Sequence, residues 1–102
     1  MLDLPKSCLE EVQSILNRHL PGCEVRAFGS RVNSTARPFS DLDLAIMTSS
    51  PLDINTLIAL RDSFSDSNLP FTVDIVDWSK TGESFRKIID KDYVVIQEGL
   101  KG

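Results

Sequence analysis

Short apolar segments of strand character alternate with amphipathic helical segments along this chain of 102 residues. Each change from helical spacing to a dense apolar run marks a change of secondary structure. Alternation of this kind is typical of an α/β (α+β) domain in which α-helices flank a small mixed β-sheet. The expected helices are residues 7–20, 50–64 and 81–90, and the expected strands are residues 23–28, 42–47 and 71–76.

Local signals indicate where several of these elements begin. Ser7 and Glu10 have the spacing of a capping box for the first helix. Pro51 stands at a permitted early position of the helix that Ser50-Pro51 opens, with apolar positions expected at Ile54, Leu57, Ile58 and Phe64. Residues 31–39 are expected to hold a short helix and a loop. Residues 93–96 fit either a last strand or a helical extension, and the directions of the strands remain open.

Length and charge narrow the classes of protein to consider. A chain of this length fits one domain, residues 1–102, with little room for a second. The net charge of −4 and the pI near 4.8 argue against broad binding to nucleic acid. No apolar run approaches the roughly 20 residues that span a bilayer, and the N-terminus lacks the basic and apolar regions of a signal peptide. We therefore expect a cytoplasmic protein.

The cysteines and the histidine offer little catalytic chemistry. Cys8 and Cys23 lie too far apart for a Cys-x-x-Cys pair, and buried free thiols are expected. His19 is the only histidine, which argues against a histidine-based metal site within the chain. It is expected at a helix C-terminus, where positive charge is favourable.

Three aspartates lie in or beside apolar strands. Asp41 and Asp43 are separated by one residue, so in a strand they point to the same face while Leu42 and Leu44 enter a core. Two neighbouring carboxylates repel each other unless a cation lies between them. Asp74 lies within the third expected strand, where an unpartnered acid is costly. If this strand neighbours the second, the three carboxylates form a site suited to Mg²⁺ or Mn²⁺.

A Gly-Ser turn supplies a complementary feature. Gly29 and Ser30 follow the first expected strand, and a glycine there lets backbone N–H groups approach phosphate oxygens closely. From Val25 to Ser40 the chain carries Arg26, Arg31 and Arg37 but no acidic residue. A basic island beside carboxylates suits a nucleoside triphosphate bridged by metal. Ordinary turn and solvated-loop roles remain open for these residues, and Asp77 is expected to be a turn or helix-capping residue.

The stretch GSRVNSTARPFSDLDL resembles the G-S-x10-D-x-D signature of minimal nucleotidyltransferases, the MNT family of the polymerase-β-like superfamily. The third strand FTVDIVDW and the tail ESFRKIIDKDYVVIQ are similar to those of small MNT proteins that pair with HEPN-type helical bundles. The resemblance spans about residues 12–97. It implies a nucleotidyltransferase fold, with the signature positions filled by Gly29, Ser30, Asp41, Asp43 and Asp74.

The resemblance also implies an activity. Such proteins look like antitoxins that transfer AMP from ATP to a HEPN toxin encoded nearby, with a tyrosine as acceptor. Asp41, Asp43 and Asp74 would be catalytic and hold Mg²⁺ or Mn²⁺, while Gly29, Ser30 and Arg31 would bind the nucleotide. A hetero-oligomer with the HEPN partner is expected.

Two other functions remain open at this stage. One is a non-catalytic antitoxin that occludes its partner, although the complete set of acids argues against a vestigial site. The other is an enzyme that modifies a small molecule of the antibiotic type with a separate substrate-binding subunit. The residues do not identify the acceptor, the preferred base or the stoichiometry.

Overall fold

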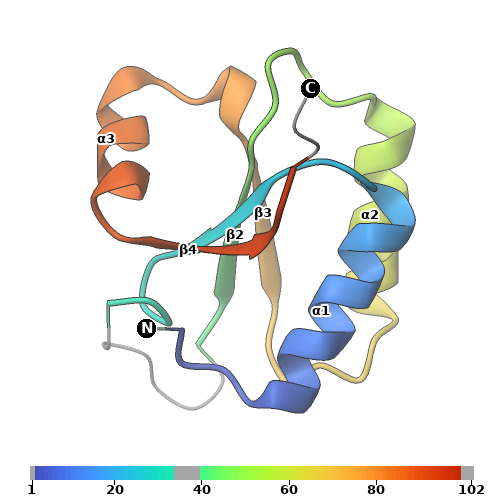
Figure 1. Cartoon of the computed structure of the whole chain (residues 1–102). Helices are drawn as coiled ribbons and strands as arrows, with labels where there is room; N and C mark the ends of the chain where they lie inside the picture. The colour runs from blue at the N-terminus through green and yellow to red at the C-terminus, as the bar shows by residue number, and fades with distance from the viewer. Residues whose placement is uncertain (1, 34–39, 100–102) are drawn as a thin grey trace.

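The computed structural model describes residues 2–33 and 40–99. Three α-helices and a four-stranded sheet account for most of them, with a short 3₁₀ helix after the third strand (Figure 1). In chain order the elements are α1 (Lys6–His19), β1 (Val25–Phe28), β2 (Leu42–Ile46), α2 (Ile54–Ser65), β3 (Val73–Asp77), η1 (Trp78–Lys80), α3 (Glu83–Lys91) and β4 (Tyr93–Gln97). The expected α/β (α+β) class with a mixed sheet is confirmed.

The sheet has the strand order β3-β2-β1-β4. The central strand β1 is antiparallel to both β2 and β4, and β2 is parallel to β3. The β2–α2–β3 segment is therefore a parallel crossover, and the register pairs Asp43 with Asp74. Residues 93–96, for which a strand and a helix were both considered, belong to β4 at one edge of the sheet.

Helices cover the two faces of the sheet unequally. Figure 1 shows α1 and α2 together on one side and α3 on the other. Leu42, Leu44 and Ile46 of β2 are buried with α1 and α2 in the larger core. Ala45 faces the opposite way and packs with Phe28 and with Ile89 of α3 in a small second cluster. Because side chains alternate along a strand, Asp43 shares the face of Ala45.

Two predicted helix starts are wrong. No side chain caps α1, whose N-cap is Pro5, and Ser7 is already the second residue of the helix. The capping box therefore does not form, because Pro5, with a helix-compatible φ of −56°, takes the N-cap position two residues before Ser7. The second helix begins at Ile54 rather than at Ser50, and Asp53 caps it by accepting a hydrogen bond from the Thr56 N–H.

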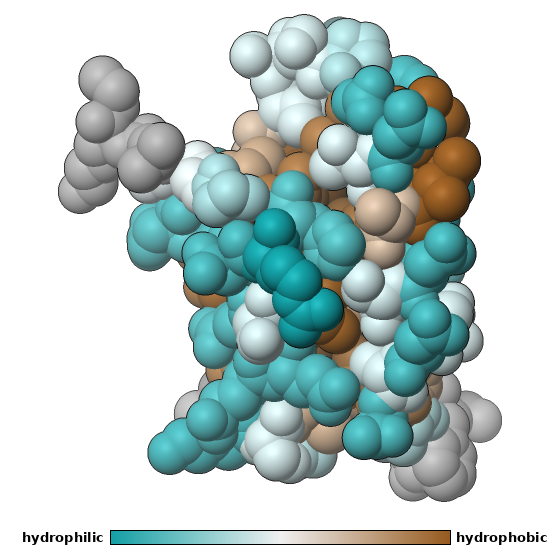
Figure 2. Space-filling view, turned by 90° about the vertical axis from the view of Figure 1, so that its right-hand side faces the viewer, coloured by the Kyte–Doolittle hydropathy of each residue, from teal (hydrophilic) through white to brown (hydrophobic). Residues whose placement is uncertain are grey.

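The apolar faces of α2 and α3 also differ from expectation. Leu60 and Phe64 are the buried residues of α2, whereas Ile54 and Ile58 remain 63% and 50% exposed. In α3 only Ile89 is buried, and Phe85 and Ile88 are 43% and 65% exposed. Figure 2 shows the surface on the α1–α2 side as mostly hydrophilic with hydrophobic side chains grouped at its upper right. Helical periodicity locates an apolar stripe but not the part of it that the chain itself covers.

The remaining expectations concern isolated residues. Both cysteines are free but only partly buried, and burial followed by the charges of Glu24 and Asp77 raises the pKa of the Cys23 thiol. His19 ends α1 as expected, and its Nε2 lies 2.6 Å from the Ser63 hydroxyl.

None of the helices in the described ranges is both long enough and apolar enough to span a membrane.

Candidate active site

The predicted carboxylates lie at the junction of β2 and β3. Asp43 in β2 and Asp74 in β3 occupy paired positions of the parallel ladder, so their side chains leave the same face of the sheet. Asp41 directly precedes β2. The sequence prediction depended on β3 lying beside β2, and the structure confirms that adjacency.

Electrostatics reflects this crowding. Burial, followed by the charges of Asp74 and Asp41, raises the pKa of Asp43. Burial, then the charge and a hydrogen bond of Asp41, raises the pKa of Asp74, while Arg61 acts in the opposite direction. The carboxylates thus repel one another, and a cation between them would relieve that repulsion.

The donor set fits a hard divalent cation in its chemistry. Carboxylate oxygens on two adjacent strands are ligands that Mg²⁺ and Mn²⁺ accept, together with water. Among the described residues, no three His, Cys, Asp or Glu side chains are gathered closely enough to hold one ion. The aspartates would therefore have to rotate toward a shared cation.

The Gly-Ser turn packs directly against Asp43. Gly29 follows β1 with φ +83°, a left-handed conformation that favours glycine. A Cβ atom at this position would overlap with Oδ2 of Asp43 and lie 3.3 Å from its Cγ. The Gly29 carbonyl accepts hydrogen bonds from the N–H groups of Val32 and Asn33, both at 3.0 Å. This helical turn leaves the N–H groups of Ser30 and Arg31 outside its own bonding pattern, as at a helix N-terminus.

The contacts of the Arg31 side chain give it a structural role. Its side chain is 7% exposed, and its guanidinium lies 4.4 Å from the Phe71 ring centroid. Nε donates to the Ser40 carbonyl at 2.9 Å and Nη1 to the Asp3 carbonyl at 3.0 Å. Arg31 therefore connects three segments: the N-terminal residues, the residue before Asp41 and the segment that leads into β3. This arrangement gives no support to a phosphate contact by the Arg31 side chain.

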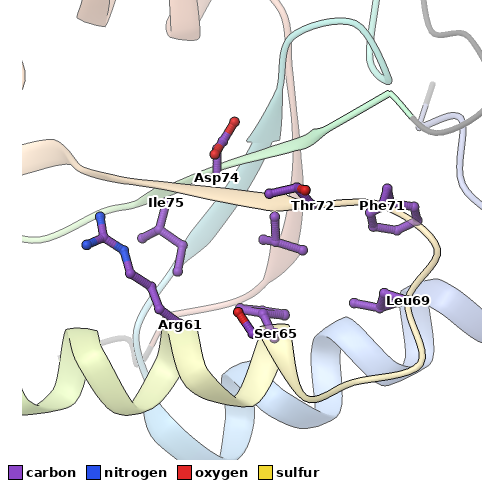
Figure 3. Close-up of a pocket in the computed structure, with 9 residues that line it drawn as sticks. Arg61, Ser65, Leu69, Phe71, Thr72, Asp74 and Ile75 are labelled. Atoms are coloured by element: carbon purple, nitrogen blue, oxygen red, sulfur yellow. The ribbon is translucent and has the colours of Figure 1, made fainter.

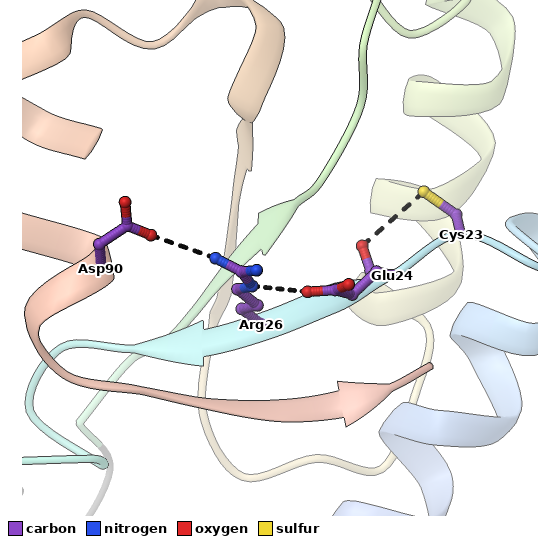
Figure 4. A network of polar contacts seen from close by, with 4 residues as sticks. All are labelled: Cys23, Glu24, Arg26 and Asp90. Atoms are coloured by element: carbon purple, nitrogen blue, oxygen red, sulfur yellow. Dashed lines mark hydrogen bonds and ion pairs between the residues drawn. The ribbon is translucent and has the colours of Figure 1, made fainter. Parts of the chain in front are cut away.

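The other arginines of the basic island contribute differently. Figure 4 shows Arg26 between Glu24 and Asp90, with Nε 2.6 Å and Nη1 3.1 Å from their carboxylates. Its guanidinium also lies 4.2 Å from the Tyr93 ring centroid. Arg37 lies outside the described residues. Because these contacts engage its guanidinium, Arg26 is not available to bind phosphate.

Asp77 is a capping residue, as predicted. Its carboxylate accepts hydrogen bonds from the Thr48 hydroxyl, from the Leu52 N–H at 2.8 Å and from Ser79. Burial raises its pKa, but these hydrogen bonds outweigh burial and lower the pKa overall. Asp77 therefore holds the loop before α2 to the end of β3 and is not aimed at the other aspartates.

A cavity of about 720 Å³ lies between α2 and β3, beside Asp74. Figure 3 shows Asp74 and Ile75 on opposite sides of β3, with Arg61 reaching from α2 toward the strand. Arg61 could not be identified from the sequence, because its nearness to Asp74 depends on how α2 packs beside β3. The only local signal is its place on one helical stripe with Ile54, Ile58 and Ser65. The lining residues are Arg61, Phe64, Ser65, Leu69, Phe71, Thr72, Val73, Asp74 and Ile75.

Comparison with known families agrees with this geometry. A family model described as "Polymerase beta, Nucleotidyltransferase" matches residues 10–99. The chain therefore belongs to the polymerase-β nucleotidyltransferase family. It is similar to the probable protein adenylyltransferase MntA of Haemophilus influenzae, with 50% identity over 100 residues, which cover 98% of this chain and 88% of that protein.

Solved structures share the fold. A crystal structure of a toxin–antitoxin complex with AMP-PNP contains a chain that superposes with a TM-score of 0.74 at 21% identity, covering 91% of this chain and 74% of that one. A structure of tri-AMPylated Shewanella oneidensis HEPN toxin in complex with MNT antitoxin gives a TM-score of 0.65 at 20% identity, covering 88% of this chain and 69% of that one. At these identities the likeness shows the nucleotidyltransferase fold.

Proposed function

We propose that this chain transfers AMP from ATP to a HEPN-type toxin and thereby acts as the antitoxin of a toxin–antitoxin pair. The observation that carries the proposal is the pairing of Asp43 with Asp74 beneath a glycine turn that contacts Asp43. The 50% identity to a probable protein adenylyltransferase supports the choice of AMP and of a protein acceptor. The toxin named in the structure with AMPylated HEPN protein supports the class of partner.

The position of each residue indicates the role that it would have in the reaction. Asp41, Asp43 and Asp74 would hold Mg²⁺ or Mn²⁺, which when bound offsets negative charge on the phosphates and lowers the pKa of an attacking hydroxyl. Gly29 and the Ser30 hydroxyl and N–H would hold the terminal phosphates, since these donors of the turn have no acceptor among the described residues. Arg31 would contribute its backbone N–H, and its side chain would position Asp41 by holding the Ser40 carbonyl.

The proposed reaction is a displacement at the α-phosphorus of ATP. The acceptor hydroxyl oxygen forms a bond to the α-phosphorus of ATP. The bond from this phosphorus to the oxygen that bridges the α- and β-phosphates breaks. Pyrophosphate leaves with that electron pair, and the hydroxyl proton passes to the Asp74 carboxylate and then to water. Asp74 suits this role because it is exposed and lies on the edge strand β3, where an acceptor from another chain has access.

The whole chain, residues 1–102, would act as one catalytic domain in the cytoplasm, in a hetero-oligomer with the toxin. Most of the described residues build the sheet and its helices, which leaves no separate acceptor-binding domain among them. In this proposal the HEPN-type partner supplies the acceptor surface.

The direct test is mass spectrometry of the HEPN-type partner after incubation with this protein, ATP and Mg²⁺. We expect a gain of one or more AMP units, abolished by Asp43→Asn. Asp62→Asn is the matched control, because Asp62 is an exposed acid on α2. Neutralisation of the toxin without any mass gain, retained in Asp43→Asn, would overturn the enzymatic proposal in favour of occlusion.

A further inference from the structure

The sheet has an open edge next to Asp74. In the order β3-β2-β1-β4, β3 is an outermost strand and pairs only with β2. The Leu42 N–H donates to the Thr72 carbonyl at 2.9 Å, and Leu42 is paired with Val73. In such a parallel ladder Val73 and Ile75 turn their N–H and C=O groups away from β2. None of the described residues pairs with this outer side of β3.

Exposed edge strands are usually protected from pairing by charged side chains or proline. The acids of β3 do not serve that purpose. Asp77 is engaged by Thr48, Leu52 and Ser79, and Asp74 faces the other aspartates. The backbone of Val73 and Ile75 is therefore open to a further strand.

The flank of α2 extends this open edge. Residues 54, 58, 61 and 65 form one helical stripe, and its last two members, Arg61 and Ser65, line the cavity below β3. Ile54 and Ile58 are 63% and 50% exposed, and Arg61 has no ion pair within 4.0 Å among the described residues. An extended chain on β3 would thus have an apolar surface and an available cation beside it.

We propose that the acceptor protein binds by adding an extended segment to the outer edge of β3. Building on the proposed function, this inference specifies how the acceptor is presented. Side chains opposite each other on neighbouring strands have Cβ atoms about 4.5–5.5 Å apart. A hydroxyl-bearing residue on the Asp74 face of the added strand therefore reaches Asp74. Its neighbours in sequence point into the cavity, where Arg61 favours an acidic or aromatic side chain.

Residue-resolved hydrogen exchange of the ¹⁵N-labelled protein tests the strand addition directly. On adding the HEPN-type partner without nucleotide, we expect the outward N–H groups of Val73 and Ile75 to become protected at least about tenfold, as backbone hydrogen bonds form. The outer edge of β4 serves as internal control and should keep its exchange rates. Protection of β4 with none at Val73 and Ile75 in a formed complex would overturn the inference.

A pair of substitutions tests the same contact through function. Ile75→Pro removes an outward N–H, which an edge strand tolerates, and also changes a side chain that packs against the core. Ile75→Val keeps the donor and most of that side chain. At limiting partner concentration we expect Ile75→Pro to lower AMP transfer by roughly tenfold or more and Ile75→Val by less than about twofold. Circular dichroism establishes that both variants are folded. Equal AMP transfer by the two folded variants would contradict strand addition. If Ile75→Pro does not fold, the hydrogen-exchange experiment on the wild-type protein decides between the outcomes.

The two proposals fail in different ways. AMP transfer to the partner without protection of β3 would overturn strand addition and leave the proposed function standing. Protection of β3 without AMP transfer would overturn the proposed function and support the docking edge.

Discussion

At the scale of single residues, Gly29 couples the phosphate-binding turn to the carboxylates. Its positive φ and its contact with Asp43 both exclude a side chain. We expect Gly29→Ala to destabilise the protein by about 1–2 kcal/mol through backbone strain and to abolish nucleotide binding, since Asp43 must move. Urea denaturation and calorimetry with a non-hydrolysable ATP analogue measure the two effects.

Gly82→Ala is the matched control for this substitution. Gly82 has φ −68°, and an added Cβ atom there would meet nothing within 4 Å. We expect nucleotide binding to be unchanged in this variant. Normal analogue binding by Gly29→Ala would show that the turn is not the phosphate cradle.

At the scale of elements, Asp77 joins the end of β3 to the loop that precedes α2. Because hydrogen bonds lower its pKa in the folded state, its stabilisation is present above the unfolded pKa of about 4 and is lost as pH falls through the lower folded value. We expect Asp77→Asn to unfold at lower urea concentration than wild type at pH 7, with the difference shrinking below about pH 4. An equal difference at pH 7 and pH 3 would contradict this account.

At the scale of the whole molecule, ligand binding to the folded state should raise global stability. A ligand at 100 times its Kd stabilises by about 2.7 kcal/mol, which corresponds to a Tm increase of roughly 10 °C or more for a chain of this size. We expect this increase in the Tm of the wild-type protein when Mg²⁺ and an ATP analogue are both present. We expect no such increase for the Asp43→Asn variant under the same conditions. The same increase for wild type and Asp43→Asn would place the nucleotide elsewhere.

Much of the fold and the core of the candidate site follow from sequence patterns. Alternating periods predict the helices and most of β1, β2 and β3, and the spacing of Gly29-Ser30 and Asp41-Leu42-Asp43 identifies the family. These features are readable because strand and turn chemistry depends on residues near one another in the chain. The catalytic and binding roles of the aspartates and of the Gly-Ser turn stay predictions, and the Asp43→Asn and Gly29→Ala variants test one residue of each group.

Only the tertiary structure decided the remaining features. The parallel pairing of β2 with β3 makes Asp43 and Asp74 neighbours, and the strand order leaves β3 open. Packing directs Arg31 to backbone carbonyls and brings Arg61 near Asp74, and it leaves Ile54 and Ile58 exposed on a helix whose periodicity suggested burial. Local patterns show which residues can pair or be buried, but the partner that satisfies each one is chosen by segments distant in the chain.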